Sequence, residues 1–447
     1  MVTRSIMFVL LCGFTALLHA QTPPQPATVI QNVRIFDGKS GKLSGPSHVL
    51  VRGNTIERIS ATPIAIDGHA DAVVIDGGGR TLMPGLIDVH WHAMLVRPTP
   101  ASALSADVGY TTLVASAEAT DTLLRGFTTV RDLGGPTFGL KRAIDEGIVA
   151  GPRIFPSGAV ITVTGGHGDF RQLYELPRVL GEPPSRMEVL GASMVADSPD
   201  EVRVRVREQL MLGATQIKLT AGGGVASPHS PIDVTTFTEP ELRAAVEAAE
   251  NWGTYVTVHA YTSESIQRAI GQGVKCIEHG HLMDEPTAKL MAERGIWLSI
   301  QPFSEDMANV FPPGSDEREK FHEVFAGMDA AYRLAKKYKL KTAFGTDVLF
   351  SPALAQRQGA LLATLTRWYA PAEVLVMATG TNAQLLALSG KRSPYPGKLG
   401  VVEEGALADL LLVDGNPIED IALIEDPGRN FVLIMKDGKI YKNTLPK

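Results

Sequence analysis

The chain has 447 residues, which is too long for one compact core and suits a large α/β domain with a smaller domain beside it. Its formal net charge of -6, from 42 basic and 48 acidic residues, argues against a nucleic-acid-binding protein, which would carry a basic excess. The composition, 44% hydrophobic and 20% charged, is that of a folded globular protein, and its 2 cysteines are too few for a disulfide scaffold or a thiolate metal site.

The first twenty residues differ from the rest of the chain and predict a signal peptide over residues 1–20. Arg4 provides a positive start, residues 6–18 are nearly all apolar, and Leu-His-Ala at 18–20 ends in a small residue before the expected cut. A membrane anchor is the alternative, but the apolar run is too short to cross a bilayer stably. We therefore expect cleavage near Ala20, no stable membrane anchor, and a mature protein that is periplasmic or secreted.

Short runs of β-branched residues, broken by Gly, Asn and Asp turns, mark both ends of the mature chain. The first stretch extends from Ala27 to about Met83, and the same pattern returns from about Gly397. Asp-Gly pairs end two apolar runs in the second stretch, and the later pair is typical of a hairpin. We predict that residues 21–83 and 397–447 pair into one small β-sandwich domain.

The middle of the chain, residues 84–396, alternates strand and helix patterns. Thr238 before Glu-Pro-Glu is a capping box with proline in the first turn, which marks the start of one helix. An α/β fold of the (β/α)8 TIM barrel type is predicted, because eight strands alternate with helices over about 300 residues. An open doubly wound sheet is the alternative, but no glycine-rich dinucleotide motif follows an early strand. The candidate strands are 86–92, 128–134, 153–158, 216–222, 255–261, 276–281, 297–302 and 341–347.

Histidines gather where these predicted strands end. His90, His92, His259 and His279 lie at C-terminal ends of strands, which is where barrel enzymes keep their active sites. His90 and His92 are two residues apart, so both side chains project to the same face of the strand and can share one ion. A single strand-end histidine is more often a hydrogen-bonded structural residue than a ligand.

Lys218 and Asp347 extend this group. Lys218 alternates with apolar neighbours and therefore faces the predicted barrel interior, and Asp347 ends the eighth strand in FGTD. Each has an ordinary alternative, since a strand lysine can reach past the rim and an aspartate after Gly-Thr can cap a turn. The conjunction of six such residues is hard to obtain by chance, and imidazole with carboxylate suits a divalent ion, with zinc as the default.

The candidate ligands lie in the motifs PGLIDVHWH, QIKLTAGG, VTVHAY, CIEHGH and FGTD, and a further segment, GVVEEGALADLLLVDGNP, follows near the C-terminus. Together these motifs resemble the amidohydrolase superfamily, in its imidazolonepropionase-like branch. Within that branch the chain is most similar to bacterial binuclear-metal Xaa-Xaa carboxypeptidases and prolidases, and to ochratoxin-hydrolysing amidohydrolases. The resemblance covers essentially the whole mature chain.

This resemblance implies two divalent metal ions, most simply zinc. The implied ligands are His90, His92, Lys218, His259, His279 and Asp347. Lys218 would be N6-carboxylated, and its carbamate would bridge the two ions. The chemistry agrees with a buried lysine, because carboxylation needs a neutral amine and burial lowers the pKa of an amine.

The same resemblance implies a metal-dependent hydrolase that cleaves the amide bond to a C-terminal amino acid. Substrates would be small molecules, either dipeptides or N-acyl amino acids, with ochratoxin A as one candidate. A metal-bridging hydroxide would attack the carbonyl, and Asp347 would carry the proton to the leaving amine. His167 and Tyr261 match active-site positions and would bind the oxyanion or a substrate carboxylate. The relatives alone suggest a homo-oligomer, with an octamer as one option.

Two alternatives belong to other classes. The first is an imidazolonepropionase-type or deaminase-type hydrolase of a ring substrate, but such deaminases commonly carry a glutamate where this chain has Thr262. The second is a non-catalytic metal-binding protein, because a fold does not guarantee a function. The filled ligand positions argue against this second alternative.

Other residues near the motifs receive weaker predictions. His281 is expected to support a ligand, His229 to contact substrate or lie at the surface, and Asp132 and Cys276 to be structural. The long insertion from His167 to about Pro199 has the length of a lid or binding loop. Its arginines, any of which would suit a substrate carboxylate, are Arg171, Arg178 and Arg186.

Overall fold

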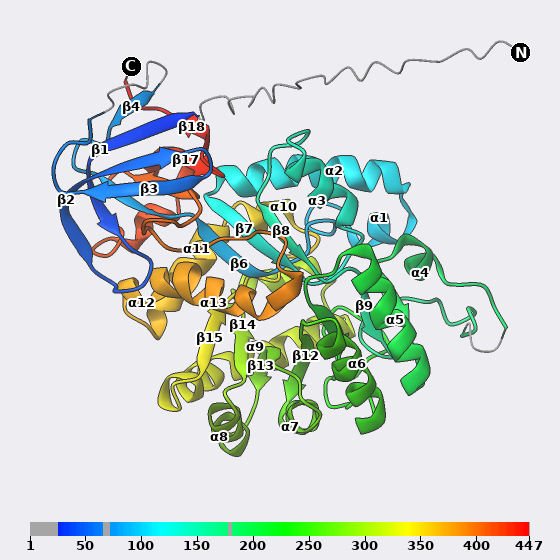
Figure 1. The fold of residues 1–447 in the computed structure, drawn as a ribbon. Coiled ribbons are helices and arrows are strands. Elements are labelled where there is room, and N and C mark those ends of the chain that lie inside the picture. The colour runs from blue at the N-terminus through cyan, green and yellow to red at the C-terminus, as the bar shows by residue number, and fades with distance from the viewer. Residues whose placement is uncertain (1–25, 66–71, 178–180, 447) are drawn as a thin grey trace, which may run out of the picture.

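The computed structural model describes residues 26–65, 72–177 and 181–446 (Figure 1). The predicted signal peptide and its cleavage site therefore lie outside the described residues. Within the described part of the chain, no helix has both the length and the apolar character needed to cross a membrane.

Parallel strands form the centre of the molecule, and helices cover their outer side (Figure 1). One sheet contains β6 (Leu86–Trp91), β7 (Phe127–Asp132) and β8 (Arg153–Pro156) in this order. The other contains, in order, β10 (Ser193–Val195), β9 (Val160–Thr162), β11 (Ile217–Thr220), β12 (Val256–Thr262), β13 (Cys276–Leu282), β14 (Trp297–Ile300) and β15 (Lys341–Phe344). The predicted α/β fold of the TIM-barrel type is confirmed, and all eight candidate strands are present, with ends that differ from the predicted ones by up to three residues.

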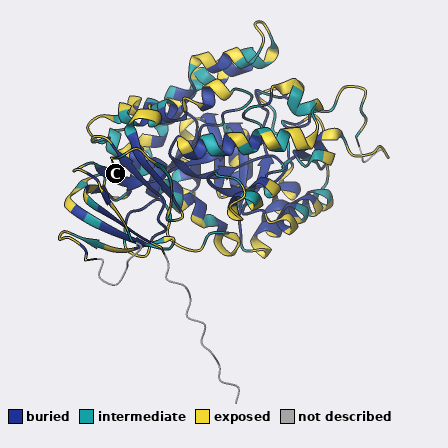
Figure 2. Ribbon diagram, turned by 90° about the horizontal axis from the view of Figure 1, so that it is seen from above, coloured by how far each residue is buried: buried dark blue, intermediate teal, exposed yellow. Residues whose placement is uncertain are grey.

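These strands are buried on both faces, as Figure 2 shows by the dark blue at the centre of the molecule. Every residue of β6 is buried, because one face of the strand lies inside the barrel and the other lies under helices. The strands therefore read as largely apolar runs, interrupted by single polar side chains such as Arg131 in β7 and Lys218 in β11.

Side chains connect the two parallel sheets at the positions where no backbone pairing between strands connects them. Between β15 and β6, the Asn382 Oδ1 atom accepts from the Phe344 N–H at 3.0 Å, and its Nδ2 donates to Ile87 O at 2.7 Å and to Phe344 O at 2.8 Å. Between β8 and β11, the Gln216 Nε2 donates to Phe155 O at 2.9 Å. Buried backbone groups at both seams thus have partners.

The sequence analysis did not predict β9 and β10. Both strands have only three residues, and β9 pairs with β10 on one side and with β11 on the other. β9 therefore takes the place beside β11 that the third predicted strand would occupy in a regular barrel. The expected insertion after the third strand contains β10 and the short helix α4 (Arg186–Leu190).

Helices of the outer layer begin and end at recognisable caps. In α6 (Glu239–Asn251), the Glu241 carboxylate accepts from the Thr238 N–H at 2.7 Å, so the predicted capping box is confirmed. α5 (Pro199–Leu212) begins at Ser198, whose hydroxyl accepts from the Glu201 N–H, and ends at Gly213 in the left-handed region. The other helices are α1 (Pro100–Ser105), α2 (Val108–Leu124), α3 (Phe138–Asp145), α7 (Ser263–Gly271), α8 (Glu285–Arg294), α9 (Asp316–Lys337), α10 (Pro352–Ala355), α11 (Gln358–Ala363), α12 (Pro371–Val376), α13 (Asn382–Leu386) and α14 (Pro427–Asn430).

Strands from both ends of the chain form one eight-stranded sheet. Its order is β18 (Lys439–Asn443), β17 (Phe431–Lys436), β16 (Leu410–Val413), β5 (Thr81–Pro84), β1 (Ala27–Phe36), β2 (Leu43–Arg52) and β3 (Thr55–Ser60), with β4 (Val73–Asp76) paired to β1. The sheet curls over an apolar core, because the Ile56 N–H in β3 donates to Ala406 O at 2.9 Å, just before β16. The boundaries at 83/84 and 396/397 remain a prediction.

Gly85 alone separates β5, in this sheet, from β6, in the barrel. A Cβ atom at Gly85 would lie 2.0 Å from the Thr128 Oγ1, so no larger residue fits without displacing β7. The chain therefore passes from one domain into the first ligand-bearing strand with no loop between them.

Candidate metal centre

The six predicted ligands meet at the C-terminal ends of the barrel strands and line one cavity of about 650 Å³. They are His90 in β6, His92 just after it, Lys218 in β11, His259 in β12, His279 in β13 and Asp347 beyond β15. Ligand atoms of His90, His279 and Asp347 all lie within 4.8 Å of one another, which is close enough to hold one ion. The structure thus brings the whole predicted set into one site.

Asp347 is the point at which two of the histidines converge. Its Oδ1 lies 3.2 Å from the His92 Nε2 and 3.4 Å from the His90 Nε2. Asp347 has a φ of 52° and His279 a φ of 78°, both in the left-handed region that non-glycine residues seldom adopt. Backbone strain at two residues of one cavity is typical of a functional site.

Three of the histidines have one ring nitrogen occupied by a carbonyl oxygen. The His92 Nδ1 lies 3.2 Å from Gly134 O, the His259 Nε2 lies 2.8 Å from Gly223 O, and the His279 Nδ1 lies 2.7 Å from the Gln301 Oε1. A carbonyl oxygen only accepts, so the occupied nitrogen carries the ring hydrogen and the opposite nitrogen keeps its lone pair. This arrangement fits a metal ligand.

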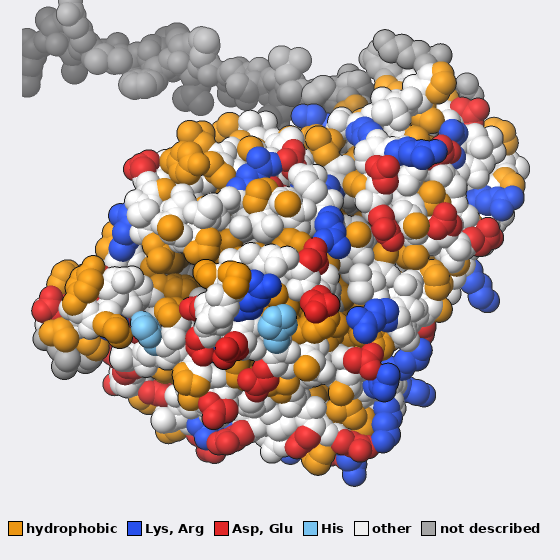
Figure 3. Space-filling view, turned by 180° about the vertical axis from the view of Figure 1, so that it is seen from behind, with side chains coloured by type: hydrophobic (Ala, Val, Ile, Leu, Met, Phe, Trp, Pro, Cys, Tyr) orange, Lys and Arg blue, Asp and Glu red, His pale blue; other side chains and the backbone are white. Residues whose placement is uncertain are grey.

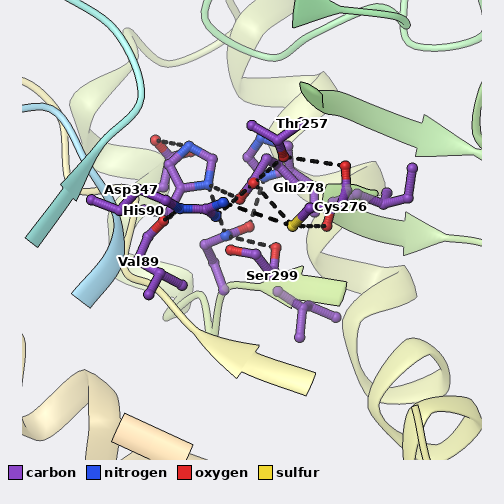
Figure 4. A network of polar contacts seen from close by, with 12 residues as sticks. Val89, His90, Thr257, Cys276, Glu278, Ser299 and Asp347 are labelled. Atoms are coloured by element: carbon purple, nitrogen blue, oxygen red, sulfur yellow. Dashed lines mark hydrogen bonds and ion pairs between the residues drawn. The ribbon is translucent and has the colours of Figure 1, made fainter. Parts of the chain in front are cut away.

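A buried carboxylate that the sequence analysis did not select, that of Glu278, lies beside His90 (Figure 4). The Glu278 Oε2 is 3.0 Å from the His90 Nδ1, and the Glu278 Oε1 accepts from the Arg131 Nη2 at 2.6 Å. The Gln301 amide nitrogen, which carries two hydrogens, lies 3.1 Å from the same His90 atom and also donates to Ser299 O. The His90 Nδ1 therefore faces the Glu278 carboxylate and the Gln301 amide, whereas its Nε2 faces Asp347.

Glu278 is charged although it is completely buried. Burial alone would raise the pKa of Glu278, but the Arg131 guanidinium and His90 outweigh burial and hold that pKa well below its ordinary value. Arg131 is fixed in turn, because its Nε donates to Val89 O at 2.6 Å and its Nη1 to the Tyr255 hydroxyl at 2.9 Å. The Arg131–Glu278 ion pair thus lies next to the predicted ligands, and its carboxylate contacts the ring of His90.

Lys218 has the environment that a carboxylated lysine needs. Its side chain lies in the buried part of the cavity, with the residue 3% exposed, and its amine makes no hydrogen bond with any described residue. Burial lowers the pKa of Lys218 below its ordinary value, which favours the neutral amine. An unpaired buried ammonium would be costly, so this environment favours the neutral amine.

His167 and Tyr261 lie against the ligands. The His167 ring stacks on the His259 ring with centroids 4.2 Å apart, and the Tyr261 ring lies 4.8 Å from His259 and 4.9 Å from His279. Burial and nearby Lys218 lower the pKa of His167 to about 3, so its imidazole is neutral. Burial raises the pKa of Tyr261 well above its ordinary value, so its phenol keeps its proton. Both residues line the cavity.

The secondary candidates take varied positions. The His281 Nε2 lies 3.1 Å from Gln301 O and its ring stacks on Phe303, whereas His229 is exposed at the cavity rim. The Asp132 carboxylate accepts from the Ala93 N–H at 2.7 Å. Cys276 is buried beside Glu278.

The arginines of the insertion also differ from one another. Arg171 lines the cavity and is paired with Asp169 at 2.6 Å, whereas Arg186 donates to backbone carbonyls of residues 104 and 106. Arg178 lies outside the described residues. Arg171 is therefore the arginine of this group that stands beside the cavity.

Apolar side chains form most of the cavity beyond the ligands. They come from the segments that follow β6, β9, β14 and β15, and include Leu95, Phe170, Phe303, Met307, Phe311, Phe321, Leu349 and Phe350. Arg171 and Glu317 add single charges to this wall. The cavity therefore offers a large apolar volume next to a polar centre.

Comparisons with known proteins agree with this architecture. A model of the amidohydrolase family matches residues 81–441. Ochratoxinase from Aspergillus niger is 31% identical over 388 residues, which cover 81% of this chain and 75% of the relative. A crystal structure of a prolidase complexed with N-methylphosphonate-L-proline matches with a TM-score of 0.85 at 34% identity, over 94% of this chain and 100% of that one. Imidazolonepropionase from Deinococcus radiodurans is 25% identical over 433 residues, or 92% of this chain and 94% of the relative.

Proposed function

Because the chain belongs to the amidohydrolase family, we propose that it is a metal-dependent hydrolase of the amide bond that joins an acyl group to a C-terminal amino acid. The observation that carries the proposal is the convergence of four histidines, a buried lysine and an aspartate in one cavity. In His92, His259 and His279 one ring nitrogen faces a carbonyl oxygen, so the opposite nitrogen keeps a lone pair that can bind a metal ion. Such a donor set suits divalent ions, with zinc as the first choice.

The chain's own groups divide between two ion positions. His90, His92 and Asp347 would hold one ion, His259 and His279 would hold the second, and a carboxylated Lys218 would bridge them. Two such ions supply Lewis acidity, which lowers the pKa of water and polarises a substrate carbonyl. Burial lowers the pKa of Lys218, and this shift towards the neutral amine supports its carboxylation.

Asp347 is proposed as the proton carrier. Burial alone would raise the pKa of Asp347, but His90, His92 and Lys218 outweigh burial and keep its pKa below the ordinary value. Its carboxylate is therefore free to accept a proton from the attacking water at neutral pH. It would then deliver that proton to the nitrogen of the departing amino acid, which would otherwise be a poor leaving group.

His167 and Tyr261 are proposed to donate hydrogen bonds to the substrate. Both are neutral, both line the cavity, and both touch the ring of His259. A neutral imidazole N–H and a phenol O–H suit the tetrahedral oxyanion or the carboxylate of the C-terminal amino acid.

The apolar wall supports substrates with a large apolar acyl group or side chain. Xaa-Pro and Xaa-Xaa dipeptides and N-acyl amino acids fall in this class, and ochratoxin A, whose acyl group is a fused aromatic ring, is one candidate. A panel of dipeptides and N-acyl amino acids, assayed with zinc-loaded protein, tests the proposal. Release of the free C-terminal amino acid is expected, whereas full metal content without any amide hydrolysis would contradict the proposal.

A homo-oligomer and export from the cytoplasm are also proposed. Figure 3 shows hydrophobic side chains gathered at the left edge of the molecule, where the segment after Phe170 extends. Leu173 and Tyr174 in this segment are 86% and 82% exposed, an exposure that suits contact with a second copy of the chain. Light scattering at micromolar concentration tests the oligomer, and N-terminal sequencing of exported protein tests cleavage near Ala20.

A further inference from the structure

Ser227 lies between two neighbouring groups of the segment that follows β9. Its Oγ accepts from the Gly168 N–H at 2.9 Å, and the same oxygen lies 2.9 Å from the His167 Nδ1. Ser227 is completely buried, and no other hydrogen bond of its hydroxyl is formed within the described residues. Ser227 is not one of the predicted site residues, but it contacts one of them, His167.

The geometry determines where the hydroxyl hydrogen goes. The Ser227 oxygen accepts from the Gly168 N–H, and among the described residues its O–H has one acceptor, the His167 Nδ1. The His167 Nδ1 then holds a lone pair, and the ring hydrogen lies on Nε2. This opposite nitrogen makes no hydrogen bond with any described residue, and the ring lines the cavity.

The loop that carries Ser227 is itself tied to the barrel wall by Lys320 in α9. The buried Lys320 Nζ donates to Ser227 O at 2.8 Å and to Ser230 O at 3.4 Å. Two carbonyl groups of the loop thus share one cation, which holds the serine at a fixed distance from the histidine. Asp316 lies 3.1 Å from the same amine and balances its charge.

The same loop also fits closely around both stacked rings. A Cβ atom at Gly224 would lie 2.1 Å from the His167 Nδ1, so only glycine allows the ring to lie there. Gly223 O accepts from the His259 Nε2 at 2.8 Å. Both stacked imidazoles therefore carry their hydrogen on Nε2. His259 turns this N–H to the loop and keeps a lone pair on Nδ1, which suits a metal ligand, whereas His167 turns Nδ1 to the loop and leaves its N–H free, which suits a donor.

We infer that Ser227, held by Lys320, is a positioning residue that fixes the His167 tautomer with its hydrogen on Nε2, so that His167 serves as a hydrogen-bond donor to the substrate. The substrate contact rests on the proposed function, but the tautomer is a property of the protein alone. The tautomer and the substrate contact can therefore be tested by separate measurements, and either can prove wrong without the other.

The tautomer is read by ¹⁵N NMR of full-length, histidine-labelled, zinc-loaded protein, with the His167 signals assigned by their loss in His167→Gln. Ser230→Ala is the matched control, because Ser230 lies on the same loop, is buried, and has a hydroxyl without a hydrogen-bond partner within the described residues. Wild type and Ser230→Ala should show His167 protonated at Nε2 alone. Ser227→Ala should show a mixture of tautomers, and an unchanged pattern in Ser227→Ala would overturn the inference.

Kinetics on a hydrolysed N-acyl amino acid then test whether Ser227 acts through His167. Ser227→Ala should lower kcat/KM about five- to tenfold, as expected for loss of one neutral hydrogen bond, with metal content unchanged. In the His167→Ala background the same substitution should cost less than about twofold, because the two residues form one coupled unit. Equal losses in both backgrounds would mean a general loop effect and overturn the inference.

Lys320→Met supplies a second variant in case Ser227→Ala folds poorly. It keeps the aliphatic stem and removes only the amine, so it should loosen the loop and mix the tautomers of His167 in the same direction. A single Nε2-protonated signal in Lys320→Met would overturn the role of Lys320. If no amide is hydrolysed by any of these proteins, the proposed function fails while the NMR result still decides the tautomer.

Discussion

The Glu278 Oε2 lies 3.0 Å from the His90 Nδ1, so a buried carboxylate fixes the face of the imidazole that is turned away from Asp347. Glu278→Gln keeps the shape of this side chain but removes its charge. Metal affinity should fall about 10–100-fold, the usual effect of losing a carboxylate that orients a ligand histidine. Competition with a chromogenic chelator measures the metal affinity of the variant and of the wild type.

The same substitution leaves Arg131 buried without a charged partner, so stability also falls, by roughly 3–5 kcal/mol. Glu188→Gln is the matched control, because Glu188 is buried and pairs with Arg205 at 3.2 Å outside the cavity lining. It should lose stability and keep metal affinity. Equal metal affinity in Glu278→Gln and Glu188→Gln would count against a role of Glu278 at the metal centre.

Lys218→Ala and Lys218→Arg should both lose bound metal and activity. The alanine variant removes the bridging group. The arginine variant keeps a positive charge, which repels the metal ions, and its guanidinium cannot be carboxylated. Metal analysis after dialysis measures the loss. Retention of two ions and full turnover by either variant would refute the bridging role.

Carboxylation of Lys218 also predicts a dependence on dissolved carbon dioxide. Metal-free protein should recover activity faster when zinc is added with bicarbonate than when zinc is added in carbon-dioxide-free buffer. The reason is that the neutral Lys218 amine must react with carbon dioxide before it can bridge the ions. Identical recovery rates in the two buffers would argue for an unmodified lysine.

Asp347→Asn should lower kcat by at least about a hundredfold, because the amide cannot carry the proton from water to the leaving nitrogen. Assays at saturating zinc separate this loss from weaker metal binding, since Asp347 also faces His90 and His92. Near-normal turnover by the metal-loaded variant would remove the proton-carrier assignment.

His281 should make the metal-free protein sensitive to acid. Burial lowers the pKa of His281 to about 4, below its ordinary value of 6.5, so between these values the unfolded chain binds a proton that the folded chain does not. Stability contributed by neutral His281 is therefore present above pH 6.5 and is lost as pH falls towards 4, at up to about 1.4 kcal/mol per pH unit. Urea unfolding of wild type and His281→Phe at several pH values measures the part of the pH dependence of the unfolding free energy that comes from His281. Parallel pH profiles for the two proteins would contradict it.

Recognition of the C-terminal carboxylate predicts discrimination between an N-acyl amino acid and its amide. Amidation should lower kcat/KM roughly 10–100-fold, since a charge-assisted hydrogen bond is worth about 1.5–3 kcal/mol. His167→Ala and Tyr261→Phe, assayed on both substrates, show which donor is responsible. Equal turnover of acid and amide by wild type would exclude a carboxypeptidase-like specificity.

The strands and the ligand set were predictable because their signals are local. β6, β12 and β13 each carry a histidine at or beyond the middle of the strand, so position in the strand alone placed His90, His259 and His279 together. β9 was missed because three residues after a glycine turn carry too little periodicity to mark a strand.

Contacts between segments that are distant in the sequence could not be predicted, for a different reason. Arg131 and Glu278 both stand within predicted apolar strands, which was a usable signal of an interior ion pair, but nothing local says that they face each other. His279 reaches the site although its neighbour Glu278 also points inward, because the left-handed backbone at His279 breaks the alternation of the strand. The pairing of Ser227 with His167 likewise depends on how two loops meet.

The junction at Gly85 has a consequence for the order in which the molecule is completed during synthesis. β5 is followed closely by β6, yet Pro84 of β5 pairs with Leu410, which is synthesised only after the whole barrel. β6, the first strand that carries metal ligands, is thus synthesised early, whereas the sheet that contains β5 is completed late. Strand pairings between residues so distant along the chain also form slowly. Ribosome-bound chains that stop short of β16 should therefore leave β5 open to proteases, and the metal centre should mature only after β16 has emerged from the ribosome.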